Sequence, residues 1–309
     1  MLKNTLLLLI SLAIICSCQP PEDSSQTGQF VAVDQYIEEA LKTDHFHGAI
    51  TIASQDSILY SRQVGIANRN WDIPEAADTR FDVASINKSF IAGLVMLAVE
   101  EGKLTTESRL VDLLKNFKYS GQFHDSITVH HMLSHSSGLP DYDYVPGDLS
   151  ANGFKKFKRL HFTNESYVDF ISTVRVVSTP NARFYYSNFA YHLLCVILED
   201  LYHKSFPEWL QENICHPLEL SNTYSSIDNQ AVAKRLALGY SWKESSQQWF
   251  ANNFIDLTLG RRIFSTSEDL VKWARALNDN RLFKKESREL MTQNYLSEIT
   301  DDFSYGYGW

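Results

Sequence analysis

The chain has 309 residues, of which 44% are hydrophobic and 21% are charged, with a formal net charge of −9 at pH 7. This length and composition are typical of a globular protein that folds as one two-lobed domain or as two domains. The acidic balance and the lack of a basic run argue against a nucleic-acid binder, so we expect no nucleic-acid partner.

The N-terminal residues indicate export. Lys3 precedes a largely apolar run at 6–15, which is too short to span a bilayer and suits the hydrophobic part of a signal peptide. Small or apolar residues then lead to Cys18 and resemble a bacterial lipobox. We therefore predict a signal peptide over 1–18 and lipidation of Cys18. Cys16 is the poorer candidate because a bulky isoleucine precedes it, and a cleaved signal peptide without lipid is the alternative.

The next segment separates this N-terminus from the folded part. Residues 19–29 are rich in Pro, Ser, Glu and Asp, which predicts a flexible tether before a domain at 30–309. We expect an exported protein held at a bacterial membrane by its lipid, on the periplasmic side or at the cell surface. Cys195 and Cys215 remain in the mature chain. Cys195 lies in an apolar run, so we expect it to be a buried small hydrophobe, although export makes a disulfide chemically possible.

Hydrophobic spacing predicts the elements in chain order. An amphipathic helix is expected over 30–43, followed by a β-hairpin of 48–54 and 58–65 around a Gln-Asp turn. Helices then dominate, and the predicted ones span 85–101, 109–117, 128–134, 165–174, 188–202 and 206–214. A second hairpin and two helices follow, at 238–242 with 248–250, 266–277 and 285–293.

This order of elements predicts an α+β fold. A helical lobe at 81–235 is inserted into an α/β lobe made of 30–80 and about 236–309. We expect the chemistry in a crevice between the two lobes.

Two short motifs carry the candidate chemistry. Ser85 and Lys88 open a predicted helix, which would place hydroxyl and amine one turn apart on the same face. A serine hydroxyl needs a base nearby, and burial at an electropositive helix N-terminus favours the neutral amine of a lysine. Tyr186 adds a second proton-transfer group. Asn188 can orient either partner or hold a substrate carbonyl, and the backbone N–H of Ser85 could serve as an oxyanion donor.

Each motif alone is weak, since about one Ser-x-x-Lys is expected by chance in a chain this long. Both stand in longer stretches that resemble the serine β-lactamase/D-alanyl-D-alanine carboxypeptidase superfamily, particularly its class C-like branch of penicillin-binding proteins and esterases. The similar stretches are 53–68 with 78–85, 127–140, 184–188, 264–270 and 305–309. The likeness covers most of residues 45–309.

The resemblance implies a β-lactamase/transpeptidase-like fold, with an antiparallel sheet flanked by helices and no cofactor. It implies that Ser85 is acylated while Lys88 and Tyr186 share the general-base work, and that the acyl-enzyme is then hydrolysed. Asn188 would help to bind the substrate. The expected substrate is an amide or ester: a peptidoglycan stem peptide, a β-lactam or a small ester.

Two departures from the family pattern stand out. The family's third motif, Lys-x-Gly or His-x-Gly, normally follows the Tyr-Gly-x-Gly-Trp landmark, but this chain stops at Trp309. We therefore expect a C-terminally truncated domain with an incomplete sheet. Loss of one oxyanion donor lowers a rate about 100- to 1,000-fold, so the alternative is a catalytically silent lipoprotein that at most binds ligand. Arg261 and Arg262 are the second departure, and we expect their loop to face the site differently.

Several histidines invite a metal-site interpretation. His130, His131 and His135 lie close in sequence, but no matching set of carboxylates or cysteines accompanies them. The family also carries histidines there without metal, so we predict no metal. His45 and His47, beside the first predicted strand, are expected to be structural.

Two pairs of aromatic residues could line a pocket. They are Tyr142/Tyr144 and Tyr185/Phe189, but packing is the preferred interpretation for both.

Two related enzyme classes fit the sequence less well. The chain lacks the Glu-x-x-Leu-Asn segment of class A β-lactamases, and it lacks the Gly-x-Ser-x-Gly elbow of α/β-hydrolase esterases.

Overall fold

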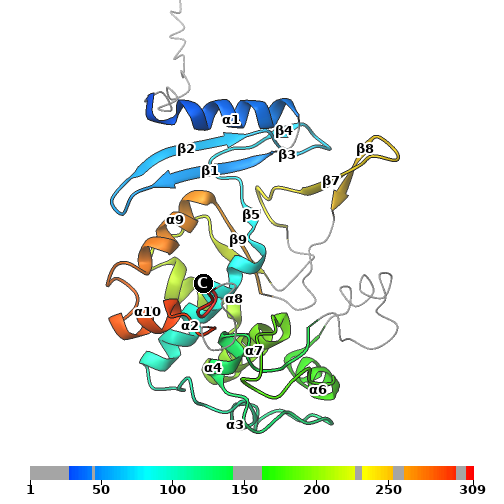
Figure 1. Ribbon diagram of the computed structural model, residues 1–309, viewed down its shortest axis with the longest axis vertical. Coiled ribbons are helices and arrows are strands. Elements are labelled where there is room, and N and C mark those ends of the chain that lie inside the picture. The colour runs from blue at the N-terminus through cyan, green and yellow to red at the C-terminus, as the bar shows by residue number, and fades with distance from the viewer. Residues whose placement is uncertain (1–27, 44–45, 142–161, 227–231, 253–260, 297–303) are drawn as a thin grey trace, which may run out of the picture.

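The computed structural model describes residues 28–43, 46–141, 162–226, 232–252, 261–296 and 304–309 (Figure 1). The predicted signal peptide, the predicted lipidation site Cys18 and most of the predicted tether lie outside these residues. So do His45, Tyr142 and Tyr144. Within the described ranges, no helix is both long and apolar enough to cross a bilayer.

The N-terminal helix and hairpin have the predicted form. A 3-10 turn at Gly28–Phe30 leads into α1 (Val31–Lys42). Strands β1 (Gly48–Ala53) and β2 (Ile58–Val64) then pair antiparallel. In Figure 1 helix α1 lies along one side of this hairpin. A small apolar cluster joins helix and hairpin, and its buried members are Phe30, Ile37, Tyr60 and Val64.

The two faces of the hairpin contact different helices because side chains alternate along a strand. Tyr60 belongs to the cluster on the α1 side. Its neighbour Ser61 and the opposite residue Thr51 face α9 (Ser267–Ala276) on the other side. There the Thr51 and Ser267 hydroxyl oxygens lie 2.8 Å apart. The α1 side thus combines an apolar cluster with hydrogen bonds and ion pairs to Asp34 and Glu38 of α1, whereas hydroxyl contacts join the other face to α9.

The remaining strands are short, and all the paired strands are antiparallel. They are β3 (Ile66–Asn68), β4 (Ile73–Pro74), β5 (Phe81–Asp82), β6 (Tyr224–Ser226), β7 (Gly239–Lys243), β8 (Gln248–Asn252) and β9 (Arg262–Ser265). Among the described residues they form separate sheets with the orders β1-β2, β3-β4, β5-β9-β6 and β7-β8. The second predicted hairpin is β7–β8. The three-stranded sheet matters most for the site, because β5 leads directly to Ser85.

The helices follow the predicted order. They are α2 (Asn87–Glu100), α3 (Leu110–Leu113), α4 (Val129–Leu133), α6 (Asn164–Thr173), α7 (Asn188–Tyr202), α8 (Phe206–Leu210), α9, and α10 (Lys285–Thr292). Helix α7 has the predicted bounds, whereas α3 is shorter than predicted. A π-helical turn at Gln211–Cys215 extends α8 and covers the end of its predicted range.

The main core surrounds α2 and α7. Phe90 and Leu94 of α2 are fully buried, as are Leu193 and Val196 of α7. Trp273 of α9 stacks on Phe90, with ring centroids 4.4 Å apart. Helix α10 also packs on α2, so helices that lie far apart in the sequence share one core.

Cys195 and Cys215 are buried free thiols, as the apolar sequence around Cys195 predicts. Burial raises the pKa of each thiol to about 12. Both therefore stay protonated near neutral pH and contribute packing.

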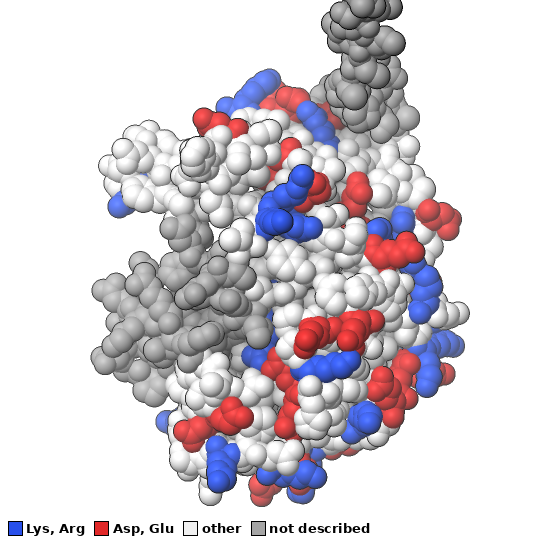
Figure 2. Space-filling model, turned by 180° about the vertical axis from the view of Figure 1, so that it is seen from behind, with Lys and Arg blue, Asp and Glu red and all other residues white. Residues whose placement is uncertain are grey.

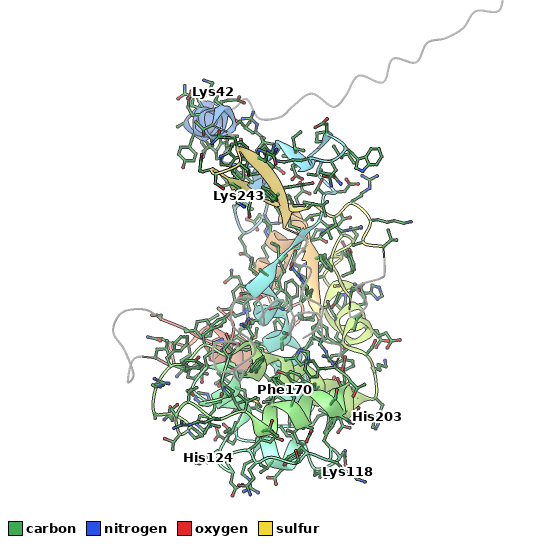
Figure 3. All side chains as sticks on the ribbon, turned by 90° about the vertical axis from the view of Figure 1, so that its right-hand side faces the viewer. Lys42, Lys118, His124, Phe170, His203 and Lys243 are labelled. Carbon is green, nitrogen blue, oxygen red and sulfur yellow. The ribbon has the colours of Figure 1, made fainter. Side chains whose placement is uncertain are left out.

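The molecule is elongated. Figure 3 places Lys42 of α1 and Lys243 of β7 at one end, and Lys118, His124 and His203 at the other. On the face drawn in Figure 2, acidic and basic side chains are interspersed.

Candidate active site

Ser85 lies on a strained turn between β5 and α2. A 3-10 turn spans Ala84–Ile86, so Ser85 precedes the α-helix, whereas we predicted it on the helix itself. Ala84 has φ of 45°, a left-handed conformation that a non-glycine residue seldom adopts. The carboxylate of Asp82 accepts the Ala84 N–H at 3.0 Å, and Arg262 forms an ion pair with the same carboxylate. These contacts stabilise a turn that leaves Ser85 exposed.

The structure brings the four predicted site residues together. Tyr186 Oη donates to Ser85 Oγ at 2.7 Å. Lys88 is buried, and its Nζ donates to Asn188 Oδ1 at 2.7 Å. The same Nζ lies 4.7 Å from the centroid of the Tyr186 ring. Tyr186 therefore supplies a hydrogen bond to Ser85 Oγ, and the Lys88 amine contacts the Asn188 side chain. The catalytic roles themselves stay predictions.

Asp141 fixes the orientation of Asn188, and the sequence interpretation missed it. Asn188 Nδ2 donates to Asp141 Oδ2 at 3.0 Å, so the amide oxygen must face Lys88. The backbone N–H of Asn188, at the start of α7, donates to Asp141 Oδ1 at 3.0 Å. A carboxylate at a helix N-terminus is electrostatically favourable. Asp141 directly follows the stretch of likeness at 127–140, and nothing in its local sequence indicates the long-range contact.

His135 joins the loop after α4 to the loop that carries Tyr186. Its Nδ1 accepts the Ser187 N–H at 3.0 Å, and its carbonyl accepts the Tyr185 N–H at 2.8 Å. Its Nε2 lies 3.1 Å from Tyr305 Oη. Burial, and then the charge of Lys88, lowers the pKa of His135 well below its ordinary value. His135 and Tyr305 are therefore further members of the site that the sequence interpretation did not assign to it.

The other predicted histidines contact protein groups. His130 Nδ1 lies 2.7 Å from Tyr307 Oη, and His131 caps α4 by accepting the Thr128 N–H at 3.1 Å. Burial lowers the pKa of both. In the described ranges no three or more potential metal ligands form a group. His47 has the structural role predicted for it, since its Nδ1 accepts the Ile66 N–H at 2.9 Å.

Of the aromatic pair Tyr185/Phe189, the ring of Phe189 is packed in the core, as expected. Tyr185 is half-buried, with the Arg183 guanidinium 5.3 Å from its ring centroid.

The last residues pack against the helix that carries Lys88. Gly308 has φ of 79°, and a Cβ there would lie 2.7 Å from the Lys88 carbonyl carbon. Glycine is required at this position because no side chain fits between the two backbones. This close approach accounts for one glycine of the predicted Tyr-Gly-x-Gly-Trp landmark.

The two consecutive arginines point in different directions. Arg262 contacts Asp82 beside the nucleophile turn, whereas Arg261 is buried against α6 and α7. Arg261 forms an ion pair with Glu199, and its Nη1 donates to His192 Nε2 at 2.8 Å. Because a guanidinium only donates, the His192 Nε2 must accept and the ring is neutral. Burial, and then the charge of Arg261, lowers the pKa of His192 well below its ordinary value.

Comparisons with known proteins agree with this architecture. The sequence matches the protein family described as Beta-lactamase over residues 33–309. It is 27% identical over 290 residues to penicillin-binding protein 4* of Bacillus subtilis (strain 168). The aligned residues cover 89% of this chain and 62% of that protein. The chain thus spans less than two-thirds of the length of this curated relative.

Two solved structures are similar to the fold. The octameric penicillin-binding protein homologue from Pyrococcus abyssi has a TM-score of 0.73 and 27% identity, over 90% of this chain and 64% of that one. The D-stereospecific amidohydrolase from Streptomyces sp. has a TM-score of 0.72 and 24% identity, over 90% and 82% of the two chains.

Proposed function

Because the chain belongs to the beta-lactamase family, we propose that it is a serine hydrolase that acts on amides or esters through an acyl-enzyme at Ser85. The observation that carries the proposal is the 2.7 Å hydrogen bond between the hydroxyls of exposed Ser85 and Tyr186. Lys88 and Asn188 lie directly beside this pair. The named relative is a penicillin-binding protein and one structural neighbour an amidohydrolase, which supports acyl transfer as the reaction class.

The chemistry follows from which group can take the serine proton. Ser85 Oγ forms a bond to the substrate carbonyl carbon while its proton passes to Tyr186 Oη, and the phenol passes its own proton to the neutral amine of Lys88. Tyr186 and Lys88 thus share the base role. The ammonium form of Lys88 places positive charge beside the oxyanion that develops. Collapse of the tetrahedral intermediate breaks the bond to the leaving amine or alcohol, which takes the proton. Water then hydrolyses the ester at Ser85.

Covalent labelling tests this proposal. The protein is treated with a fluorescent penicillin and, separately, with a fluorophosphonate, and the adduct is measured by gel fluorescence and intact mass. We expect one adduct per chain, located at Ser85 and absent in Ser85→Ala. Ser246→Ala is the matched control, since Ser246 is an exposed serine at the β7–β8 turn, and it should label as wild type. A folded wild-type protein without adduct would support the silent, ligand-binding alternative.

The proposal includes an exported location with a lipid anchor at Cys18. It is supported by Lys3, the apolar run that follows and the lipobox-like residues before Cys18. Expression in bacteria fed with radioactive palmitate should give a labelled protein in the membrane fraction. Cys18→Ser should abolish the label, whereas the control Cys16→Ser should retain it. Label that persists in Cys18→Ser would show that the lipid is attached to another residue.

A further inference from the structure

We propose that His135 and Tyr305 are positioning residues, which clamp the Tyr186 ring so that its hydroxyl meets the nucleophile. The inference rests on the proposed function, because it concerns the same site. Neither residue is among those that the resemblance implicates in the chemistry. The structural basis is a chain of contacts from the segment at 304–309, through one imidazole, to the tyrosine beside Ser85.

The backbone determines the proton position on His135. Its Nδ1 faces the N–H of Ser187, and a backbone N–H can only donate. Nδ1 must therefore carry a lone pair, and the single proton of the neutral ring sits on Nε2. Nε2–H in turn points to Tyr305 Oη, 3.1 Å away, which accepts it. Both ring nitrogens are thus used, and the imidazole has one favoured orientation.

This fixed ring lies against Tyr186. The two ring centroids are 4.3 Å apart, with an angle of 32° between the planes. Ser187, which His135 holds by its N–H, is the next residue after Tyr186. His135 therefore constrains Tyr186 twice, once through the ring face and once through the neighbouring backbone. The left-handed φ of 57° at His135 shows that the surrounding structure enforces this placement.

Tyr305 is held by its own backbone, whose carbonyl accepts the Tyr295 N–H at 3.0 Å. Tyr307, two residues later, is buried and contacts His130, and Gly308 lies against the backbone of Lys88. The segment at 304–309 thus lies on α2 and presents the Tyr305 hydroxyl to His135. The clamp links this segment to Tyr186, and α2 supplies the lysine to the same site.

Burial, and then the charge of Lys88, disfavour the protonated form of His135. The rings of Phe184, Tyr186 and Tyr191 surround the imidazole. Its two nitrogens face the Tyr305 hydroxyl, which accepts, and the Ser187 N–H, which donates. A proton on Nδ1 would face the Ser187 N–H directly, donor against donor. Protonation would therefore break the contact that aligns the Tyr186 loop.

Acylation kinetics test the clamp. Tyr305→Phe keeps the ring but removes the hydroxyl, and His135→Asn tolerates the left-handed backbone while removing the imidazole. With 4-nitrophenyl acetate we expect kcat to fall about tenfold in Tyr305→Phe and about a hundredfold in His135→Asn, with KM changing less than about threefold. Tyr295→Phe is the matched control, because its hydroxyl donates to the Leu290 carbonyl, and it should retain wild-type kcat.

A double-mutant cycle separates positioning from general destabilisation. If His135 acts through Tyr186, His135→Asn should lower kcat in the wild-type background and add less than about twofold in Tyr186→Phe. Equal effects in both backgrounds would overturn the proposal, as would an unchanged kcat in both single variants. Unfolding midpoints of all variants are measured alongside, so that a lowered midpoint with unchanged kcat identifies a purely structural role.

The clamp remains testable if the wild-type protein forms no acyl-enzyme. Nitrogen NMR of labelled histidine then reports the tautomer, and we expect His135 to carry its proton on Nε2. Tyr305→Phe should shift both the His135 Nε2 signal and the Tyr186 ring signals. A proton on Nδ1, or Tyr186 signals that stay unmoved, would overturn the clamp independently of the proposed hydrolase activity.

Discussion

The core around α2 and α7 and the hairpin end around α1 are stabilised in different ways. In the first region, large side chains from eight α-helices of the described residues and from the segment at 304–309 are almost completely buried together. In the second, a cluster of four buried residues joins α1 to the hairpin, and several large apolar side chains stay exposed. The second hairpin, β7–β8, lies at the same end of the molecule (Figure 3), and its Trp242 and Phe250 are 41% and 46% exposed.

The difference bears on the site, because the site residues depend on the large core for their positions. Ser85, Lys88, Tyr186 and Asn188 all belong to elements of the large core or to turns directly attached to it. Substitutions in that core should therefore affect both stability and the site. Substitutions at the hairpin end should affect stability alone, and by less.

The largest effect is expected from Phe90→Ala. The Phe90 ring is fully buried and stacks on Trp273, so its loss leaves a cavity between α2 and α9. Unfolding in urea should show a loss of about 3–5 kcal/mol. The matched substitution Phe250→Ala, on the exposed hairpin, should change the free energy of unfolding by less than about 1 kcal/mol. Equal losses would contradict the comparison.

Glu199→Gln comes next. The Arg261–Glu199 pair has side-chain exposures of 9% and 11%, so the substitution leaves a buried guanidinium without its counter-charge. We expect a loss of about 3 kcal/mol in the free energy of unfolding. The surface pair Lys204–Glu212 is 42% and 48% exposed, and Glu212→Gln should lower stability by at most about 1 kcal/mol. If both variants lose the same amount, the buried pair is not the stronger constraint.

Acidification should destabilise the large core through its buried histidines, most of all His135 and His192. The folded protein holds His135 and His192 neutral with lowered pKa values, whereas the unfolded chain takes up protons below about pH 6.5. Stability is therefore unaffected above that pH. As the pH falls below it, each histidine should lower stability by about 1.4 kcal/mol per pH unit until its folded pKa is reached.

Urea titrations at pH 7 and pH 5.5 measure this slope. His135→Asn should reduce it, whereas the control His203→Asn, at the exposed end of α7, should leave it unchanged. An identical slope in wild type and His135→Asn would show that the imidazole does not contribute.

The smallest effect is expected at the hairpin end, from Tyr60→Phe. Tyr60 is buried, and its hydroxyl donates to Asp34 of α1 at 2.7 Å. Removing it should lower the free energy of unfolding by about 1–1.5 kcal/mol. Labelling of Ser85 should not change, since α1 takes no part in the site. Tyr36→Phe, on the exposed side of α1, is the control and should be neutral. A loss of labelling in Tyr60→Phe would connect the hairpin to the site.

Local patterns predicted the longer elements well. The apolar spacing of α7 gave its bounds, and alternation around a turn gave the β1–β2 hairpin. Strands such as β5 and β9, with two and four residues, are too short for any period to show. Their existence depends on pairing with distant segments, which a single sequence does not display.

The same distinction applies to the site. The motifs named Ser85, Lys88, Tyr186 and Asn188, and the structure brings these four together. The hydrogen-bond order among them could not be read from spacing. Lys88 is close to Ser85 along the chain, but this spacing does not indicate that its amine donates to the Asn188 amide on α7. Asp141, His135 and Tyr305 reach the site through contacts between distant loops. The family-like stretches contain His135 and Tyr305, but no local spacing indicates these contacts.

The consecutive arginines at the start of β9 have one further consequence. Arg261 is anchored to α7 and Arg262 to the residue that holds the Ser85 turn. A shift of this strand by a single position would exchange their neighbours and separate two charges from their partners at once. The two ion pairs therefore favour a single register of β9 between the helices and the nucleophile turn.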